Sequence, residues 1–183
     1  MRSAAELAPR VLEACRRRMA MLATAESCTG GMIAAALTDI AGSSDVVERG
    51  FVVYSNDSKR EMLGVAPELL ARHGAVSEEV ARAMAEGAVS RSRAAVAVSV
   101  TGVAGPGGGT AAKPVGLVHL ACAMDGRATL HRRAVFMGDR AAVRAATVDA
   151  ALSLLLAMLG EDVAPSQAGP RPSTSENGRS GGI

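Results

Sequence analysis

The chain has 183 residues, a formal net charge of +2, and a composition that is 49% hydrophobic but only 2% aromatic. A chain of this length most simply folds as one domain with a substantial core. The near-neutral charge and the scarcity of aromatic rings argue against a nucleic-acid or membrane partner, and three cysteines without metal-ligand spacing indicate a reduced, cytoplasmic protein.

The first segment, residues 3–18, has apolar residues on one face and predicts an amphipathic helix. Ser3 and Glu6 have the spacing of a capping box. Pro9 would remove a hydrogen bond from a helix that begins at Ser3, so a kinked helix and a later start both remain open. The arginine run at 16–18 follows this polar helix and does not precede an apolar one, so we expect no secretory signal.

The segment around which the chain is organised is Thr24-Ala25-Glu26-Ser27-Cys28-Thr29-Gly30-Gly31. Before it, Met19–Ala23 is continuously apolar and predicts a strand buried on both faces; after it, residues 32–40 have helical spacing. Glycines at a strand-to-helix turn let a ligand approach the backbone, and free N–H groups at a helix start attract an anion or an oxyanion. Ser27 would then be presented at the mouth of the turn. Alternatively, Thr29 only caps the helix and the glycines only relieve crowding.

Further along, apolar periodicity and turn residues predict alternating strands and helices. The expected strands are 46–54, 94–100, 114–124 and 128–137, and the expected helices are a short one from Ser55, then 67–73, 77–93 and 138–159. Asp125-Gly126 predicts a hairpin turn between the last two strands. From Gly160 onward Pro, Gly, Ser and Gln dominate, so we expect a domain over 1–160 and a disordered tail over 161–183.

This order of elements predicts an α/β domain of three layers with a mixed sheet. Ligands of such sheets bind outside the carboxyl ends of the strands. We therefore expect the Ser27 turn, the segment Tyr54–Lys59 and the glycine-rich loop 101–109 to converge on one crevice. A loop this rich in glycine either binds a ligand or is merely flexible.

Two lysines stand out, because eighteen of the twenty basic residues are arginine. A lysine retained in such a chain is a candidate for proton transfer, which arginine cannot perform. Lys59 lies five residues after Tyr54, the only tyrosine. Together with Ser27 they suggest a serine nucleophile with a lysine base, and a tyrosine that holds the lysine, relays the proton or donates to the developing charge. The alternative is a tyrosine that ends a strand and a solvated lysine.

Two other candidates for chemistry are weaker. Cys28 is a rival nucleophile because a helix N-terminus lowers the pKa of a thiol, but no histidine lies in the same segments. His119 and His131 fall on the two strands of the predicted hairpin. Without an obvious carboxylate partner they are better explained as structural residues than as metal ligands.

Several of these segments together resemble the family of the CinA C-terminal domain. They are 25–31, 50–56 (Gly-Phe-Val-Val-Tyr-Ser-Asn), 102–109 followed by Lys113-Pro114-Val115-Gly116, and Gly138-Asp139-Arg140. The resemblance covers about residues 5–159. It implies a three-layer α/β/α sandwich with a mixed five-stranded sheet of order 2-1-3-4-5 and an antiparallel strand 4. The extra N-terminal domain of the larger family proteins has no counterpart here.

The resemblance also implies an activity, because the enzymatic members of this family are nicotinamide-nucleotide amidases. They hydrolyse nicotinamide mononucleotide to nicotinate mononucleotide and ammonia, a step of pyridine-nucleotide salvage. The family's catalytic serine, tyrosine and lysine fall on Ser27, Tyr54 and Lys59. A homo-oligomer without cofactor or metal is implied as well. The competing hypothesis is a catalytically silent nucleotide-binding module that acts through a partner.

The expected substrate-binding residues lie in the same segments. We expect the phosphate at backbone N–H groups of the Gly30-Gly31 turn or of the loop Gly105–Gly109, with Arg140 or Lys113 assisting. N–H groups from Cys28 to Gly31 could also form an oxyanion hole. The full predicted set is Cys28, Thr29, Gly30, Gly31, Asn56, Thr101, Gly102, Gly105, Lys113 and Arg140.

Overall fold

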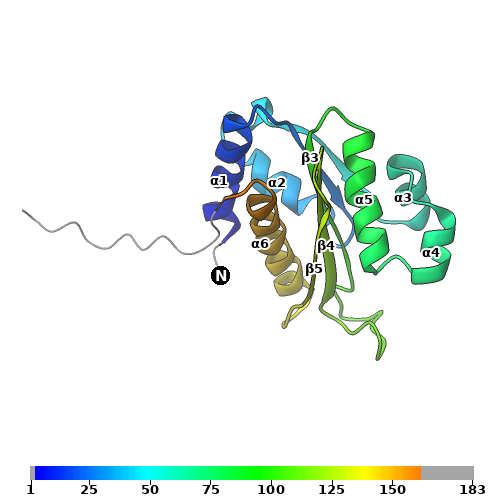
Figure 1. The fold of residues 1–183 in the computed structure, drawn as a ribbon. Coiled ribbons are helices and arrows are strands. Elements are labelled where there is room, and N and C mark those ends of the chain that lie inside the picture. Colours follow the sequence, from blue (N-terminus) through cyan, green and yellow to red (C-terminus); the bar gives the residue numbers. More distant parts are fainter. Residues whose placement is uncertain (1–2, 162–183) are drawn as a thin grey trace, which may run out of the picture.

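The computed structural model describes residues 3–161 and has one five-stranded sheet at its centre (Figure 1). The strand order is β2-β1-β3-β4-β5; β1, β2 and β3 are parallel, β4 is antiparallel to β3, and β5 is antiparallel to β4. The strands are β1 Leu22–Glu26, β2 Val47–Val52, β3 Val96–Gly102, β4 Leu117–Met124 and β5 Leu130–Val135. The predicted mixed sheet and its order are confirmed.

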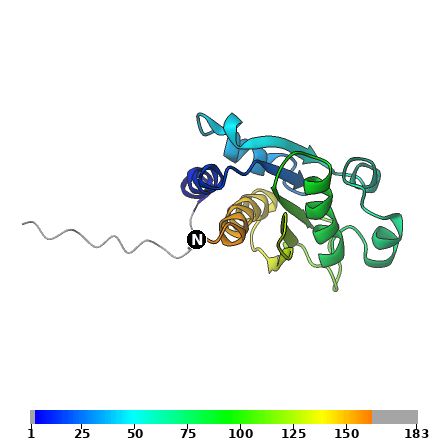
Figure 2. The ribbon, with the colours of Figure 1, turned by 45° about the horizontal axis from the view of Figure 1, so that its top comes forward.

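Helices cover both faces of the sheet and complete the predicted three layers. In Figures 1 and 2, α1, α2 and α6 lie on one face and α3, α4 and α5 on the other. The helices are α1 Ala4–Arg17, α2 Met32–Thr38, α3 Asn56–Leu63, α4 Pro67–His73, α5 Glu78–Ser90 and α6 Arg140–Met158, with a 3-10 turn at Ser43–Asp45. Pro9 lies inside α1, so the helix does not start later.

The core consists mainly of aliphatic side chains on both faces of the central strands. All five residues of β1 are buried, and β3 is buried up to its last residue. Alternate residues of these strands join the cluster under α1, α2 and α6 or the cluster under α3, α4 and α5. Within the described residues, α6 is the one helix long and apolar enough to cross a membrane, yet 56% of its most apolar stretch is buried in the domain. It is a core helix here.

The strand predicted over Met19–Ala23 was placed too early: Met19 is 94% exposed with a φ of 51°, in the turn after α1. Apolar composition alone therefore misplaced the strand, which continues through the small residue Ala25 to Glu26. The predicted disordered tail lies outside the described residues.

The contact between α5 and α3 supplies a test of the packing. A Cβ atom added at Gly87 would lie 2.1 Å from the carbonyl oxygen of Leu63, a backbone atom at the end of α3. We expect Gly87→Ala to lower the free energy of unfolding by about 1–3 kcal/mol, because overpacking at backbone outweighs the roughly 1 kcal/mol that alanine gains in helix propensity. Urea unfolding would measure it.

The matched control is Gly107→Ala, because an added Cβ there meets nothing within 4 Å. It should unfold at the same urea concentration as the parent chain. A Gly87→Ala variant as stable as the parent would contradict the close approach of α3 and α5.

Candidate active site

The turn after β1 places Ser27 at the carboxyl edge of the sheet. The backbone N–H of Ser27 donates to the carbonyl of Val100 in β3, at 3.1 Å, so the residue is still anchored to the sheet. The chain then reverses through Gly30 and Gly31, whose φ values of 61° and 101° lie in the left-handed region that favours glycine. The two glycines are therefore required by the backbone of this turn before any ligand is considered.

The structure brings Lys59 to Ser27. Nζ of Lys59 donates to Oγ of Ser27 at 3.1 Å and to the carbonyl of Val53 at 2.9 Å, and the carbonyl of Tyr54 lies at 3.5 Å. Ser55 caps α3 by accepting from the N–H of Ser58, at 3.0 Å, which starts the helix directly after β2. Lys59 thus lies on the first turn of α3 and is only 1% exposed.

Burial controls the charge of this amine. The desolvation of Lys59 lowers its pKa below the usual value, and this outweighs the opposite, smaller influence of the neighbouring Cys28. Among the contacts of Nζ are two carbonyls, which only accept, and one hydroxyl. A neutral amine has two N–H donors and one lone pair, so it can serve both carbonyls and still receive the proton of Ser27. This set of partners suits a lysine base.

Cys28 has the opposite environment to an activated thiol. It is 6% exposed, and burial raises the pKa of its thiol to about 11. The thiolate is the nucleophilic form, so at neutral pH Cys28 is almost entirely unreactive thiol. The geometry therefore favours Ser27 over Cys28 as the nucleophile, in line with the order expected from the sequence.

Glu26 is a residue of the site that the sequence interpretation missed. It is the last residue of β1 and has no exposed surface. Its carboxylate accepts four hydrogen bonds, from Oγ1 of Thr29 (2.7 Å) and from the N–H groups of Gly31 (2.9 Å), Ile33 (3.0 Å) and Ala34 (2.8 Å). A buried carboxylate of the chain itself thus caps α2, where Thr29 or an external anion was expected.

This cap has a consequence for the predicted phosphate site. The N–H of Gly31 donates to Glu26, and that of Gly30 donates to the carbonyl of Ser27 at 3.1 Å. These two donors are already in use within the turn. The Gly30-Gly31 turn is therefore a poor anion site. The sequence signal for this is Glu26, a carboxylate that ends the buried strand immediately before the turn.

We expect Glu26→Gln to weaken both the turn and any activity that depends on Ser27. The amide oxygen of glutamine can keep the three hydrogen bonds that Oε2 of Glu26 accepts. The amide NH₂ group would replace Oε1 and face the N–H of Ala34, so a buried donor would lose its acceptor. Such a loss costs about 1–3 kcal/mol, and a displaced turn should lower kcat by about 10- to 100-fold. Thermal unfolding and initial rates would measure the two effects.

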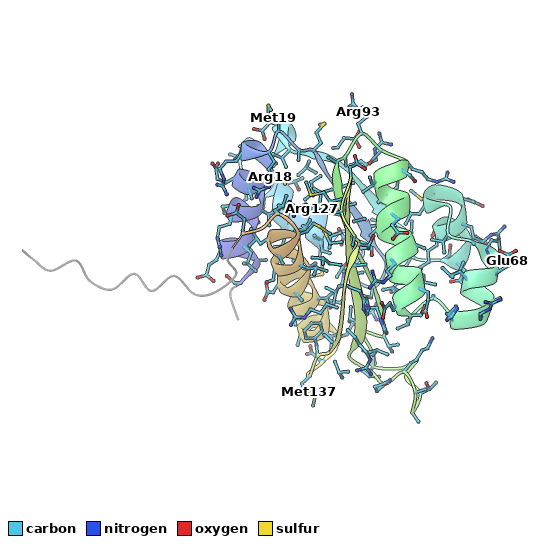
Figure 3. All side chains as sticks on the ribbon, in the orientation of Figure 1. Arg18, Met19, Glu68, Arg93, Arg127 and Met137 are labelled. Atoms are coloured by element: carbon cyan, nitrogen blue, oxygen red, sulfur yellow. The ribbon has the colours of Figure 1, made fainter. Side chains whose placement is uncertain are left out.

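Glu68→Gln is the matched control for this change, because Glu68 is an exposed glutamate on α4, at the outer edge of the molecule in Figure 3. It should change neither quantity. A Glu26→Gln protein with parental stability and kcat would show that the turn does not need this carboxylate.

A pocket of about 630 Å³ lies between the loop after β3 and the start of α6, and its lining residue Arg144 contacts the Ser27 turn. Its lining residues are Ala104, Pro106, Val115, Gly138, Asp139, Arg140, Ala141 and Arg144. Arg140 donates to the carbonyl of Gly105 at 2.8 Å and to the hydroxyl of Tyr54 at 2.8 Å. The side chain of Tyr54 is 60% exposed and points to this arginine, so only its backbone carbonyl approaches Lys59.

Arg144 is the second residue that the sequence interpretation missed. It lies one helical turn after Arg140, and its guanidinium donates to the carbonyls of Cys28 (3.1 Å) and Thr29 (2.8 Å). Arginine is so frequent in this chain that residue type gave no signal. The spacing of four residues from Arg140 at the start of a helix could have placed both on one face.

Other predicted binding residues do not come to the pocket. Thr101 donates to the carbonyl of Ala75, and Lys113 donates to the carbonyl of His73 at 2.6 Å, both toward the connection of α4 and α5. A Cβ at Gly102 would lie 2.7 Å from the carbonyl oxygen of Leu117, so close strand packing explains this glycine. Asn56 is the exposed first residue of α3.

The two histidines of the β4–β5 hairpin do form a pair. The rings of His119 and His131 are stacked, with Nδ1 and Nε2 3.0 Å apart, and His131 also contacts the carboxylate of Glu78 at 3.2 Å. The carboxylate partner that the sequence did not reveal therefore comes from α5. Within residues 3–161, no group of three or more His, Cys, Asp or Glu side chains is arranged to hold a metal ion.

Comparison with known proteins places these features in a family. The family model of the CinA C-terminal domain matches residues 4–159. Over 150 residues the chain is 51% identical to the nicotinamide-nucleotide amidohydrolase PncC of Escherichia coli K12, a match that covers 82% of this chain and 91% of that protein. A CinA-like protein of Syntrophobacter fumaroxidans is 50% identical over 152 residues, with 82% of this chain and 35% of that protein covered.

Solved structures agree with this result. The competence/damage inducible protein CihA from Agrobacterium tumefaciens has a TM-score of 0.84 and 54% sequence identity, covering 86% of this chain and 96% of that chain. A competence damage-inducible protein A from Klebsiella pneumoniae has a TM-score of 0.83 at 39% identity, covering 87% of this chain and 98% of that chain.

Proposed function

This chain belongs to the CinA C-terminal domain family, and we propose that it is an amidase that hydrolyses nicotinamide mononucleotide to nicotinate mononucleotide and ammonia. The observation that carries the proposal is the buried contact of 3.1 Å between Nζ of Lys59 and Oγ of Ser27. The 51% identity to a nicotinamide-nucleotide amidohydrolase supports the choice of substrate, which residue types alone do not define.

The proposed reaction uses Ser27 as nucleophile and neutral Lys59 as base. Lys59 takes the hydroxyl proton while Oγ attacks the carboxamide carbon, and it then gives that proton to the departing nitrogen, which leaves as ammonia. The resulting ester on Ser27 is hydrolysed by water, with Lys59 again accepting a proton and returning it to Oγ. The cycle balances without any cofactor.

The oxyanion of the tetrahedral intermediate needs donors near Ser27. The N–H groups of Gly30 and Gly31 are used within the turn, so we assign this role to the N–H groups of Cys28 and Thr29. The phosphate of the substrate would lie in the neighbouring pocket, where Arg140 and Arg144 provide guanidinium groups that match phosphate geometry. Tyr54 would then act at the pocket mouth through Arg140, and not as a partner of the lysine amine.

The direct test is to incubate the purified protein with nicotinamide mononucleotide and to assay ammonia and the acid product. Equal molar amounts of both products, in the presence of a metal chelator, would support the proposal. Tight binding of the nucleotide without product would favour the silent binding module instead. A homo-oligomer stays a prediction, which light scattering in solution would test.

A further inference from the structure

Arg144 connects the pocket to the residues that follow Ser27. Its Nε donates to the carbonyl of Cys28 and one terminal nitrogen donates to the carbonyl of Thr29, at 3.1 and 2.8 Å. The same side chain lines the pocket. A guanidinium has five N–H donors in a rigid plane, so two can hold the turn while the others face a ligand.

The Ser27 turn is therefore held by opposite charges on its two sides. The carboxylate of Glu26 receives N–H groups of the turn and of α2 from the buried side, and the guanidinium of Arg144 donates to carbonyls of the turn from the pocket side. The buried side is fixed because Glu26 has no exposed surface. The pocket side depends on a half-buried side chain at the start of α6.

The pocket has the charge that an anionic group requires. Two guanidiniums, from Arg140 and Arg144, and one carboxylate, from Asp139, line it. The carboxylate of Asp139 already accepts from the N–H of Ala142 at 2.8 Å, as the cap of α6. Two positive groups therefore oppose one negative group, which leaves a net positive charge for an anionic ligand.

We propose that Arg144 is a positioning residue that couples an anionic group bound in the pocket to the placement of Ser27. The inference rests on the proposed function, since it takes the anionic group to be the substrate phosphate. A phosphate that engages Arg144 fixes the guanidinium, and the guanidinium fixes the carbonyls of Cys28 and Thr29. Binding energy from a remote part of the substrate is thereby used at the reacting group, so a substrate without the phosphate loses kcat as well as affinity.

The test compares nicotinamide mononucleotide with nicotinamide riboside, which lacks the phosphate, with and without inorganic phosphite as a separate anion. In the parent protein we expect phosphite to raise riboside turnover by about 10-fold or more. In Arg144→Gln, riboside turnover should fall about 10- to 100-fold, as for a displaced nucleophile, and phosphite should no longer activate it. The riboside makes no phosphate contact, so this loss reports positioning alone.

Arg127→Gln is the matched control, because Arg127 also donates to a backbone carbonyl, that of Met158 at the other end of α6. Figure 3 shows Arg127 well separated from Met137, which lies just before the start of α6. The control should keep parental turnover and phosphite activation. If Arg144→Gln raised only the KM for the nucleotide and left riboside turnover unchanged, or if it unfolded more easily but kept phosphite activation, the proposal would be overturned.

A readout without substrate separates this inference from the proposed function. Phenylmethanesulfonyl fluoride, a neutral serine reagent, should label Ser27 faster with phosphite in the parent protein but not in Arg144→Gln, as followed by mass spectrometry. A phosphite response without nucleotide turnover would retain Arg144 and reject the amidase. Nucleotide turnover together with an unchanged phosphite response in Arg144→Gln would retain the amidase and reject the positioning role of Arg144. Absence of both labelling and turnover would reject both hypotheses.

Discussion

Ser27→Ala is expected to lower kcat by at least about 10³-fold. The loss could reach about 10⁶-fold if the other catalytic groups have no effect once the nucleophile is gone. Removing Oγ leaves Lys59 with a carbonyl partner at 2.9 Å, so the amine stays hydrogen-bonded and the fold should keep its melting temperature. Affinity for nicotinamide mononucleotide, measured by calorimetry, should change little, because the phosphate contacts proposed for Arg140 and Arg144 do not involve Oγ of Ser27. A large loss of kcat with retained binding is what removal of a nucleophile produces.

Two further variants make this result specific. Ser153→Ala removes a partly buried hydroxyl on α6 that donates to the carbonyl of Asp149, away from the site, and should have parental kcat. Cys28→Ala tests the rival nucleophile: its loss should be far smaller than that of Ser27→Ala, because the thiol has a pKa of about 11. The serine assignment fails if Cys28→Ala is the inactive variant and Ser27→Ala retains turnover.

The architecture could be predicted because each element is marked locally. Helix α4 has the predicted bounds, 67–73, since Pro67 fixes its first turn and Gly74 ends it. Gly126, with a φ of 73°, forms the predicted hairpin turn. The strand β1 was misplaced because its boundary depends on which residues reach a neighbour in the sheet, and that is a tertiary property that apolar composition does not encode.

The site could be predicted only in part, for a similar reason. Ser27 and Lys59 were singled out because their residue types are rare or chemically distinctive in their segments, and the structure brings the two side chains into contact, while their catalytic roles stay a prediction. Glu26 and Arg144 were not, since a carboxylate and an arginine are common at turns and on helices, and their roles exist only once α2 and α6 are packed beside the turn. Spacing placed Tyr54 near Lys59, but the direction of its side chain, toward Arg140, follows from the fold.

The remaining large effect is expected for Lys59→Arg, which should lose about 10²–10⁴-fold in kcat, the size of a missing general base, with a smaller change in KM. Arginine keeps the positive charge and can donate to the carbonyl of Val53, but its pKa above ~12 forbids it to accept the proton of Ser27. Lys113→Arg is the matched control, because Nζ of Lys113 donates to the carbonyl of His73 and arginine can do the same.

The dependence of kcat on pH separates a base from a simple cation at Lys59. Burial lowers the pKa of Lys59, so the neutral, proton-accepting fraction grows as pH rises through that lowered value. Saturated turnover should therefore climb with pH and level off below the pH at which an exposed lysine loses its proton, about 10.4. A cation that only bound the phosphate would give the opposite sign, with activity lost as the amine became neutral.

Lys59→Arg should lack the rise of kcat with pH. The double variant with Ser27→Ala should be little less active than either single variant, because the two residues act in one proton transfer. Near-parental turnover of Lys59→Arg across this range would exclude Lys59 as the base and shift that role to a water molecule beside Ser27.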